Sequence, residues 1–242
     1  MKRQMIFKQQ YYDAQKLDSR TTYSFFTESD SNEESVTSMT EDIAVKWLFQ
    51  NSSFGQFFIQ SFFEKPSGVK SFFGLTEPFT ISGKKPGDID LLLVDPERPD
   101  KAIAFECKRV KATSIDRDNS KVNNANGIKK GVIQANKYQS LGFHKSYLMI
   151  ILLDDGRHFS DYPNTMMRNN NSESVENIYD IPWNENLHDD VGIVFVKITQ
   201  PTGKHFNQMA GQGFCIDKNA TLLQQTTAMT NKVKEHLKNN VH

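Results

Sequence analysis

The sequence predicts an α/β fold in which a central mixed sheet is flanked by helices, and three stretches carry this prediction. Residues 88–95 and 102–107 are β-type runs separated by a turn-like segment at 96–101, which is the pattern of a hairpin. Residues 127–141 have helical apolar spacing, and an uninterrupted apolar run at 146–153 follows them, as in a strand buried on both faces. Because strand, helix and strand follow one another, we expect a crossover that pairs the flanking strands in parallel.

Length and composition fit one large domain, or one domain with an extension. The chain has 242 residues, with 29 basic and 29 acidic side chains and a formal net charge of zero. A neutral chain argues against a protein that coats nucleic acid non-specifically. Cys107 and Cys215 are too few for a disulfide framework, and no apolar run approaches the roughly 18 residues of a membrane span. With no secretory leader pattern, we expect a soluble, cytoplasmic protein without membrane association.

Charge is distributed unevenly along this neutral chain. Residues 28–42 contain six acidic side chains and no Lys or Arg, and residues 169–190 repeat that pattern. Residues 107–145 contain nine basic side chains and only two acidic ones. This basic segment starts at the end of the predicted hairpin, so we expect a local surface for an anionic partner there.

The chain before the hairpin is expected to hold a helix, an aromatic core segment and a short strand. Ser38 followed three residues later by Glu41 is a capping box, which predicts a helix that runs to about Gln50. We interpret the phenylalanine-rich segment 54–63 as core rather than as a base-stacking surface, and 79–81 as a short strand. Four residues form the predicted apolar stripe of the helix: Ile43, Ala44, Trp47 and Leu48.

The hairpin directs two carboxylates and an ammonium toward one point. Because side chains alternate along a strand, Glu106 and Lys108 share one face of the second run, and Asp90 can meet them from the first. Cys107 points to the opposite face, where a small apolar side chain suits a core. Two close carboxylates raise each other's pKa, and a bound divalent cation would reverse that cost.

The spacing Asp-x(15)-Glu-x-Lys resembles the core of the PD-(D/E)XK nucleases. Asp90, Glu106 and Lys108 match its acidic and basic positions, whereas Ile89 stands where the strict form has proline. The resemblance implies a restriction-endonuclease-like core with the element order αβββαβ. It also implies a bound Mg²⁺ or Mn²⁺ and a glutamate on the first core helix that points at the metal, a position that Glu41 matches. Glu41 therefore has two interpretations, a helix cap or a member of the site.

A second motif lies on the helix predicted at 127–141. Gln134 and Tyr138 are one turn apart and so share a helical face. This Q-x-x-x-Y pattern resembles the motif of the RecB-like and lambda-exonuclease-like branch of the family, which implies that both side chains position a phosphate or the nucleophile. The alternative is an exposed amide and a half-buried tyrosine. The apolar residues of this helix are expected to face inward: Ile128, Val132, Ile133 and Ala135.

The resemblance leaves an extension at each end of the chain. Beyond the hairpin, residues 109–126 are polar and predicted to form a loop or lid. A polar, acidic insertion is expected at about 155–190, followed by a strand at 192–199, and a helix is expected at 221–239. The chain is thus divided into an N-terminal extension, a nuclease-like domain and a C-terminal extension: 1–37, 38–199 and 200–242.

Oxygen ligands define the metal that this site would take. The resemblance implies Asp90, Glu106, the backbone carbonyl of Cys107 and Glu41 as ligands, and such donors favour Mg²⁺ or Mn²⁺ over a soft metal. The metal would polarise the scissile phosphate and lower the pKa of an attacking water. Lys108 would orient or deprotonate that water, or stabilise the charge that develops on the phosphoryl group.

These features predict a metal-dependent nuclease, a hydrolase of phosphodiester bonds, most simply in DNA. Two alternatives stay open: a nuclease-like domain that binds nucleic acid or a protein partner without cutting, and a plain scaffold in which Glu106 and Lys108 form an ordinary ion pair. A homo-oligomer is compatible with each. Four lysines of the basic segment are expected either to neutralise phosphates or simply to solvate the surface: Lys111, Lys129, Lys130 and Lys137.

Overall fold

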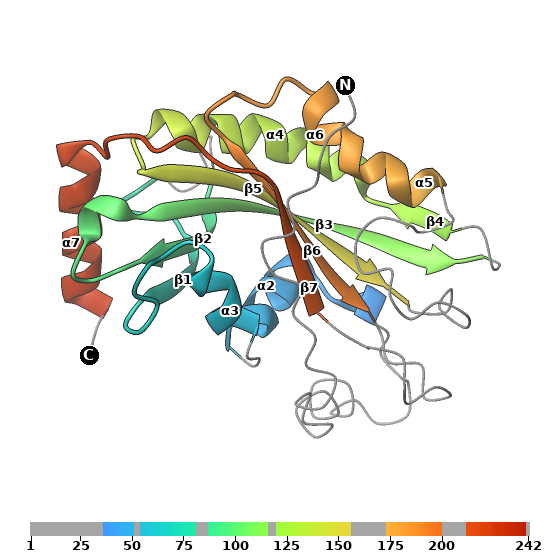
Figure 1. Cartoon of the computed structure of the whole chain (residues 1–242), viewed down its shortest axis with the longest axis horizontal. Helices are drawn as coiled ribbons and strands as arrows, with labels where there is room; N and C mark the ends of the chain where they lie inside the picture. The colour runs from blue at the N-terminus through green and yellow to red at the C-terminus, as the bar shows by residue number, and fades with distance from the viewer. Residues whose placement is uncertain are drawn as a thin grey trace.

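The computed structural model describes residues 36–50, 54–80, 87–115, 120–155, 173–199 and 212–240. They form a seven-stranded mixed sheet flanked by helices (Figure 1), so the predicted α/β class is confirmed. The strands are β1 Lys70–Leu75, β2 Ile89–Val94, β3 Ile103–Ser114, β4 Ser120–Asn123, β5 Lys145–Asp154, β6 Gly192–Thr199 and β7 Gln212–Lys218. The helices are η1 Val36–Ser38, α2 Glu41–Gln50, α3 Phe54–Gln60, η2 Pro99–Lys101, α4 Ala125–Ser140, α5 Glu173–Glu176, η3 Asn177–Asp180, α6 Ile181–Asn184 and α7 Thr227–Asn240.

The predicted hairpin and crossover form the centre of the sheet. The strand order is β1-β2-β3-β5-β6-β7, and β4 pairs with the far half of β3. β2 pairs antiparallel with both β1 and β3, whereas β3, β5 and β6 are parallel neighbours. α4 lies between β3 and β5 in the chain, so their parallel pairing confirms the predicted crossover.

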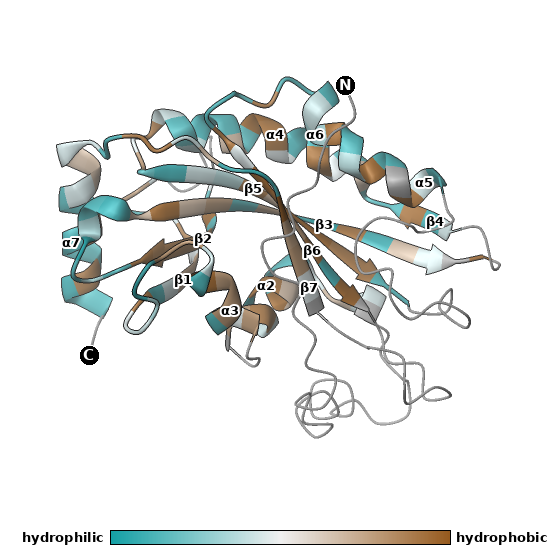
Figure 2. Ribbon diagram, in the orientation of Figure 1, coloured by the Kyte–Doolittle hydropathy of each residue, from teal (hydrophilic) through white to brown (hydrophobic). Residues whose placement is uncertain are grey.

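Helices cover the sheet on both sides. In Figure 1, α2 and α3 lie below the sheet, α4, α5 and α6 lie above it, and α7 stands at the end formed by β1 and β2. The strands at the centre are the most apolar part of the ribbon (Figure 2), and every residue of β5 after Lys145 is buried. This burial explains why the run at 146–153 is continuously apolar rather than alternating.

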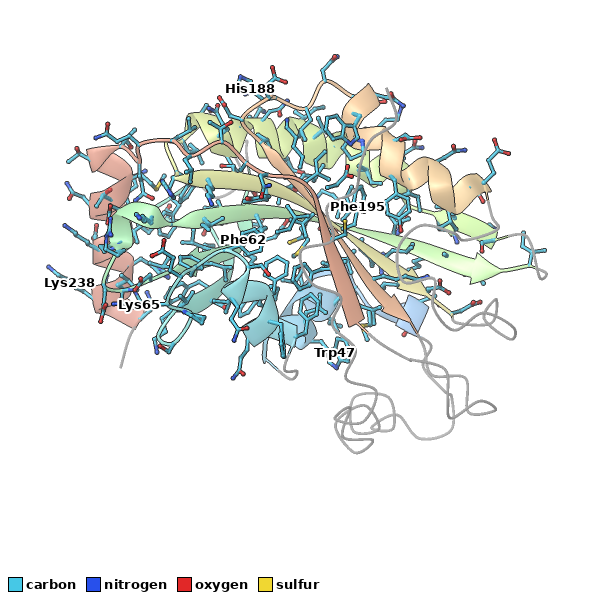
Figure 3. The ribbon with its side chains drawn as sticks, viewed as in Figure 1. Trp47, Phe62, Lys65, His188, Phe195 and Lys238 are labelled. Carbon is cyan, nitrogen blue, oxygen red and sulfur yellow. The ribbon has the colours of Figure 1, made fainter. Side chains whose placement is uncertain are left out.

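The phenylalanine-rich segment belongs to the core, as predicted. Phe54 and Phe58 on α3 are fully buried, and their rings stack 5.7 Å apart. Phe62 reaches under the sheet (Figure 3), where its ring meets the ring of Phe105 edge-on at 5.5 Å. Such aromatic contacts are worth about 0.5–1.5 kcal/mol beyond area burial. The segment therefore anchors α3 to β3 and offers little ring surface for stacking on a base.

The predicted loop at 109–126 is wrong. β3 continues through Ser114, and β4 returns along its outer edge from Ser120 to Asn123. The polar sequence hides this ribbon, but Val110 and Ala112 are buried, as alternation along a strand requires. Pairing with β5 on one side and β4 on the other satisfies the backbone of this half of β3.

Several predicted boundaries and faces also differ from the structure. Phe79 and Thr80 lie in a turn rather than a strand, and the strand that pairs with β2 on that side is β1, over Lys70–Leu75. Ile43 on α2 and Ile133 on α4 are 42% and 55% exposed, so both fall outside the inward faces predicted for their helices. In each helix the remaining apolar positions already fill the contact with the sheet.

Segments expected to be peripheral contribute to the sheet and its cover. Within the predicted insertion, three short helical elements cover 173–184, and Val175 and Tyr179 from them are buried in the core. Beyond residue 200, β7 adds an edge strand beside β6, and the C-terminal helix begins at Thr227 rather than 221. The predicted N-terminal extension lies outside the described residues apart from its last two positions. No described helix is both long and apolar enough to cross a membrane.

A buried ion pair near the ends of β5 and β6 allows a stability prediction. Lys197 Nζ lies 3.0 Å from Asp154 Oδ2, and both side chains are almost fully buried. Asp154→Ala would strand the lysine charge in the core, so we expect the free energy of unfolding to fall by about 3–5 kcal/mol. The double variant Asp154→Leu with Lys197→Met removes both charges and should lie closer to the wild type. Urea unfolding of the three proteins measures this, and an equal loss in the single and double variants would contradict it.

Candidate functional site

The pairing of β2 with β3 brings two of the predicted carboxylates together. The register places Leu91 opposite Phe105 and Leu92 opposite Ala104, so Asp90 stands opposite Glu106 when it is continued by one pair. Asp90 Oδ2 also accepts a 2.6 Å hydrogen bond from the backbone N–H of Cys107. The Cys107 side chain is buried on the core side, as predicted. The hairpin therefore holds Asp90 against the Glu106–Lys108 stretch.

The Lys108 ammonium lies where four oxygens converge. Its Nζ is 2.5 Å from Glu106 Oε1 and 2.7 Å from the carbonyl oxygen of Cys107. It is also 3.3 Å from Glu41 Oε1 and 3.9 Å from Asp90 Oδ2. All four groups that the sequence assigned to a metal therefore surround one positive charge of the protein itself.

Glu41 enters the cluster from α2 rather than from the hairpin. It is the first residue of α2, and its Oε2 accepts a 2.8 Å hydrogen bond from the backbone N–H of Arg109 on β3. The cap of α2 is instead Thr40, whose hydroxyl oxygen accepts the N–H of Ile43 at 3.3 Å. The predicted Ser38–Glu41 capping box is thus wrong, because the Glu41 carboxylate faces Lys108 rather than the helix start.

Burial sets the electrostatics of this cluster. The side chain of Glu106 is fully buried, and burial raises its pKa to about 7 against the opposing pull of Lys108. Burial, and then the charge of Glu106, raises the pKa of Asp90 to about 8. Burial would lower the pKa of Lys108, but the neighbouring carboxylates outweigh it and raise that pKa. Three carboxylates share one ammonium, so the cluster favours additional positive charge.

The donor set fits a hard divalent cation, with one condition. Oxygen ligands are the ones that Mg²⁺ and Mn²⁺ prefer, and every group around Lys108 Nζ offers oxygen. Among the described residues, no group of three or more His, Cys, Asp or Glu side chains is arranged to hold a metal as it stands. The ammonium of Lys108 is a stand-in for such an ion, and the side chain would have to move aside to admit one.

Gln134 and Tyr138 both lie against the start of β2. Tyr138 is fully buried, and its hydroxyl donates to the carbonyl oxygen of Asp88. The same hydroxyl lies close enough to Glu106 to oppose the rise in pKa that burial causes in that carboxyl group. Gln134 Nε2 lies beside Gly87, which has the positive φ of 105°. Because Tyr138 is fully buried, its hydroxyl faces the start of β2 rather than solvent.

Gly131 of α4 makes room for the stem of Lys108. A Cβ at residue 131 would lie 2.5 Å from Lys108 Cγ and 2.9 Å from Leu148 Cδ1, whereas one at Gly127 would meet nothing within 4 Å. We expect Gly131→Ala to lower the free energy of unfolding by about 1–2 kcal/mol through overpacking. Gly127→Ala in the same helix should raise it by up to about 1 kcal/mol, because alanine is the better helix former. Urea unfolding checks both, and two stabilised variants would show that Lys108 has free space after all.

A polar groove of about 620 Å³ adjoins the cluster. Its lining includes Glu41 and Lys108 from the cluster, and then Arg109, Asn123, Asn126 and Lys130. Sequence reasoning missed the arginine and the asparagines because it treated 109–126 as a loop or lid. The signal was present in the Asn-rich run at 123–126, which joins β4 to α4.

The four lysines predicted to meet phosphate have different surroundings. Lys130 lines the groove, whereas Lys129 is exposed and pairs with Glu185 at 2.6 Å. Lys111 lies on β3, where burial and then the charge of Arg109 lower its pKa. Lys137 is half-buried in the last turn of α4. Of these four lysines, Lys130 therefore lines the groove and the other three do not.

No protein-family model matches this sequence, and no curated protein is significantly similar to it. The arguments on function below therefore depend on the residues and their geometry.

Proposed function

We propose that the protein is a metal-dependent nuclease that hydrolyses phosphodiester bonds in DNA. The observation that carries the proposal is the convergence of Asp90, Glu106 and Glu41 on the Lys108 ammonium, from two strands and a helix. A plain scaffold would have no need for three carboxylates at one partly buried point, because burying charge is costly. Functional sites are where such perturbed groups gather.

The order of elements supports the same proposal. α2, then β1, β2 and β3, then α4 and β5 occur in this order in the chain, with α3 between α2 and β1 and with β4 as an addition to β3. With α3 and β4 as additions, this order matches the αβββαβ order that the resemblance to the PD-(D/E)XK nucleases implies. Within that order, Asp90 lies on β2, and Glu106 and Lys108 lie on β3.

Each residue has a defined part in hydrolysis. A water oxygen bonds to phosphorus and loses a proton to the solvent, the P–O bond to the leaving oxygen breaks, and that oxygen takes a proton from the solvent. Mg²⁺ or Mn²⁺, when bound, would polarise the phosphate and lower the pKa of the water. Asp90, Glu106, the Cys107 carbonyl and Glu41 would hold it. The raised pKa of Lys108 favours its charged form, so we assign the lysine to stabilising charge on the phosphoryl oxygens rather than to deprotonating water.

Incubation with labelled nucleic acid tests the proposal. Linear duplex, circular duplex, single-stranded DNA and RNA are each mixed with protein, with Mg²⁺, with Mn²⁺ or with chelator alone. We expect metal-dependent cleavage of DNA, and the circular arm separates endonuclease from exonuclease. Binding without cleavage in every arm would favour the non-cutting alternative, and cleavage in chelator would reveal a contaminant.

A further inference from the structure

The groove beside the carboxylate cluster differs from the cluster in charge. Among its described lining residues, Lys108, Arg109 and Lys130 are basic, and Glu41 is the one acidic residue. The first turn of α4, which forms one wall, contains no acidic side chain. The groove thus joins one proposed metal ligand, Glu41, to a set of basic side chains that favours an anion.

The polar side chains of the groove suit a sugar–phosphate backbone. The asparagine amides can donate to phosphate oxygens, and Arg109 has donors beyond the one that it uses on the Met39 carbonyl. None of the described lining residues is aromatic, so the groove has no ring on which a base could stack. Backbone contacts of this kind position a nucleic acid without reading its sequence.

Neighbouring lysines of α4 provide an internal comparison. Lys130 lines the groove, whereas Lys129 is held by Glu185 at 2.6 Å and is not among the lining residues. The two differ by one position on the helix, and both are exposed at the surface. A general attraction of the basic helix for DNA would involve both lysines, but a groove would involve Lys130.

We propose that this groove binds the sugar–phosphate backbone of the strand next to the scissile phosphate, through Lys130, Arg109 and the amides of Asn123 and Asn126. The inference deepens the proposed nuclease function by stating where the substrate strand runs. The strand leaves the carboxylate cluster over the start of α4, and base identity has no effect on its affinity. The same backbone chemistry is present in duplex and single strand.

Fluorescence anisotropy in chelator measures this binding separately from cleavage. Labelled duplexes of two unrelated sequences and one labelled single strand are titrated with wild type, Lys130→Gln and Lys129→Gln across a salt series. We expect Lys130→Gln to weaken binding about five- to tenfold and to reduce the slope of log affinity against log salt by about 1, equally for both sequences. Lys129→Gln should keep the wild-type slope. The duplex and single-strand arms tell which form supplies the backbone.

Two results would contradict the proposal that the groove binds the sugar–phosphate backbone. One is an unchanged affinity and slope in Lys130→Gln, and the other is an equal loss in both lysine variants. Wild-type cleavage in Mg²⁺ is measured in parallel, so the two proposals can fail separately. If the wild type cleaves DNA and Lys130→Gln binds DNA as the wild type does, the groove proposal fails and the nuclease proposal stands. If Lys130→Gln weakens binding as expected but the wild type does not cleave DNA, the groove proposal stands and the nuclease proposal fails.

Discussion

Lys108→Ala is expected to reduce metal-dependent cleavage by about 100-fold or more, because it removes the one charged donor at the centre of the carboxylate cluster. Lys46→Ala, which removes an exposed lysine from α2, is the matched control and should cut at the wild-type rate. Single-turnover cleavage of a labelled duplex measures both. Undiminished cleavage by pure Lys108→Ala would show that Lys108 has no part in catalysis, and the assignment of the motif would fail with it.

The same variant has a second expected property. Lys108 Nζ occupies the point on which the four oxygens converge, so a divalent cation and the ammonium compete for it. Lys108→Ala should therefore bind Mn²⁺ at least as tightly as the wild type, although it cuts poorly. Calorimetric titration of metal into the two proteins decides this. Weaker binding in the variant would show that the ammonium and the ion occupy separate places.

Asp90→Asn and Glu106→Gln are expected to remove most of the divalent-metal affinity and the cleavage that depends on it. Each replaces a charged oxygen donor with a neutral amide of nearly the same shape, so the fold should survive. Titration with Mn²⁺ measures the loss directly. Full-strength binding in either variant would place the metal elsewhere in the chain.

The pH dependence of stability follows from the same carboxylates. Burial raises the pKa of Asp90 to about 8 and that of Glu106 to about 7, both above the ordinary values of 3.8 and 4.5. These two carboxyl groups therefore bind more protons in the folded protein than in the unfolded chain between about pH 4 and pH 8, and their contribution to metal-free stability falls as pH rises through that window. Asp90→Asn removes part of this loss.

In chelator, the free energy of unfolding of Asp90→Asn should therefore exceed that of the wild type by a small amount at pH 5 and by a larger amount at pH 9. Groups that titrate in both proteins cancel from this comparison. Urea unfolding at the two pH values measures it, and an advantage that shrinks toward pH 9 would mean that the Asp90 carboxylate is stabilised in the fold rather than strained by burial.

Local patterns were sufficient to predict the centre of this fold. The hairpin that carries Asp90 and Lys108 has alternation and a turn within about twenty residues, and a helix followed by a buried strand predicts the crossover. The far half of β3 and β4 were missed because polar strands are recognisable mainly by the neighbours with which they pair, and β1 and β7 were missed because their short apolar runs do not by themselves mark a strand. Those neighbours are distant in the chain or separated by turns that the sequence does not mark strongly.

The candidate site shows the same division. Asp90, Glu106 and Lys108 follow from strand spacing, whereas the place of Glu41 depends on a contact with Arg109, 68 residues away. A glutamate in the first turn of a helix fits a cap equally well until that contact is known. Lys129 and Lys130 are also equivalent in sequence, and the packing of α4 against α6 gives Lys129 a partner in Glu185.

The position of the Lys108 ammonium bears on whether the protein can fold before it binds a metal ion. Zinc-finger domains have no stable fold until the ion arrives, because the ion supplies their folding energy. Here a tethered counter-ion already sits among the acidic groups at 2.5–3.9 Å, so the sheet can assemble in a cell compartment or buffer that lacks free magnesium. Chelation should then abolish cleavage without unfolding the protein. Returning the ion should restore cleavage without a refolding step.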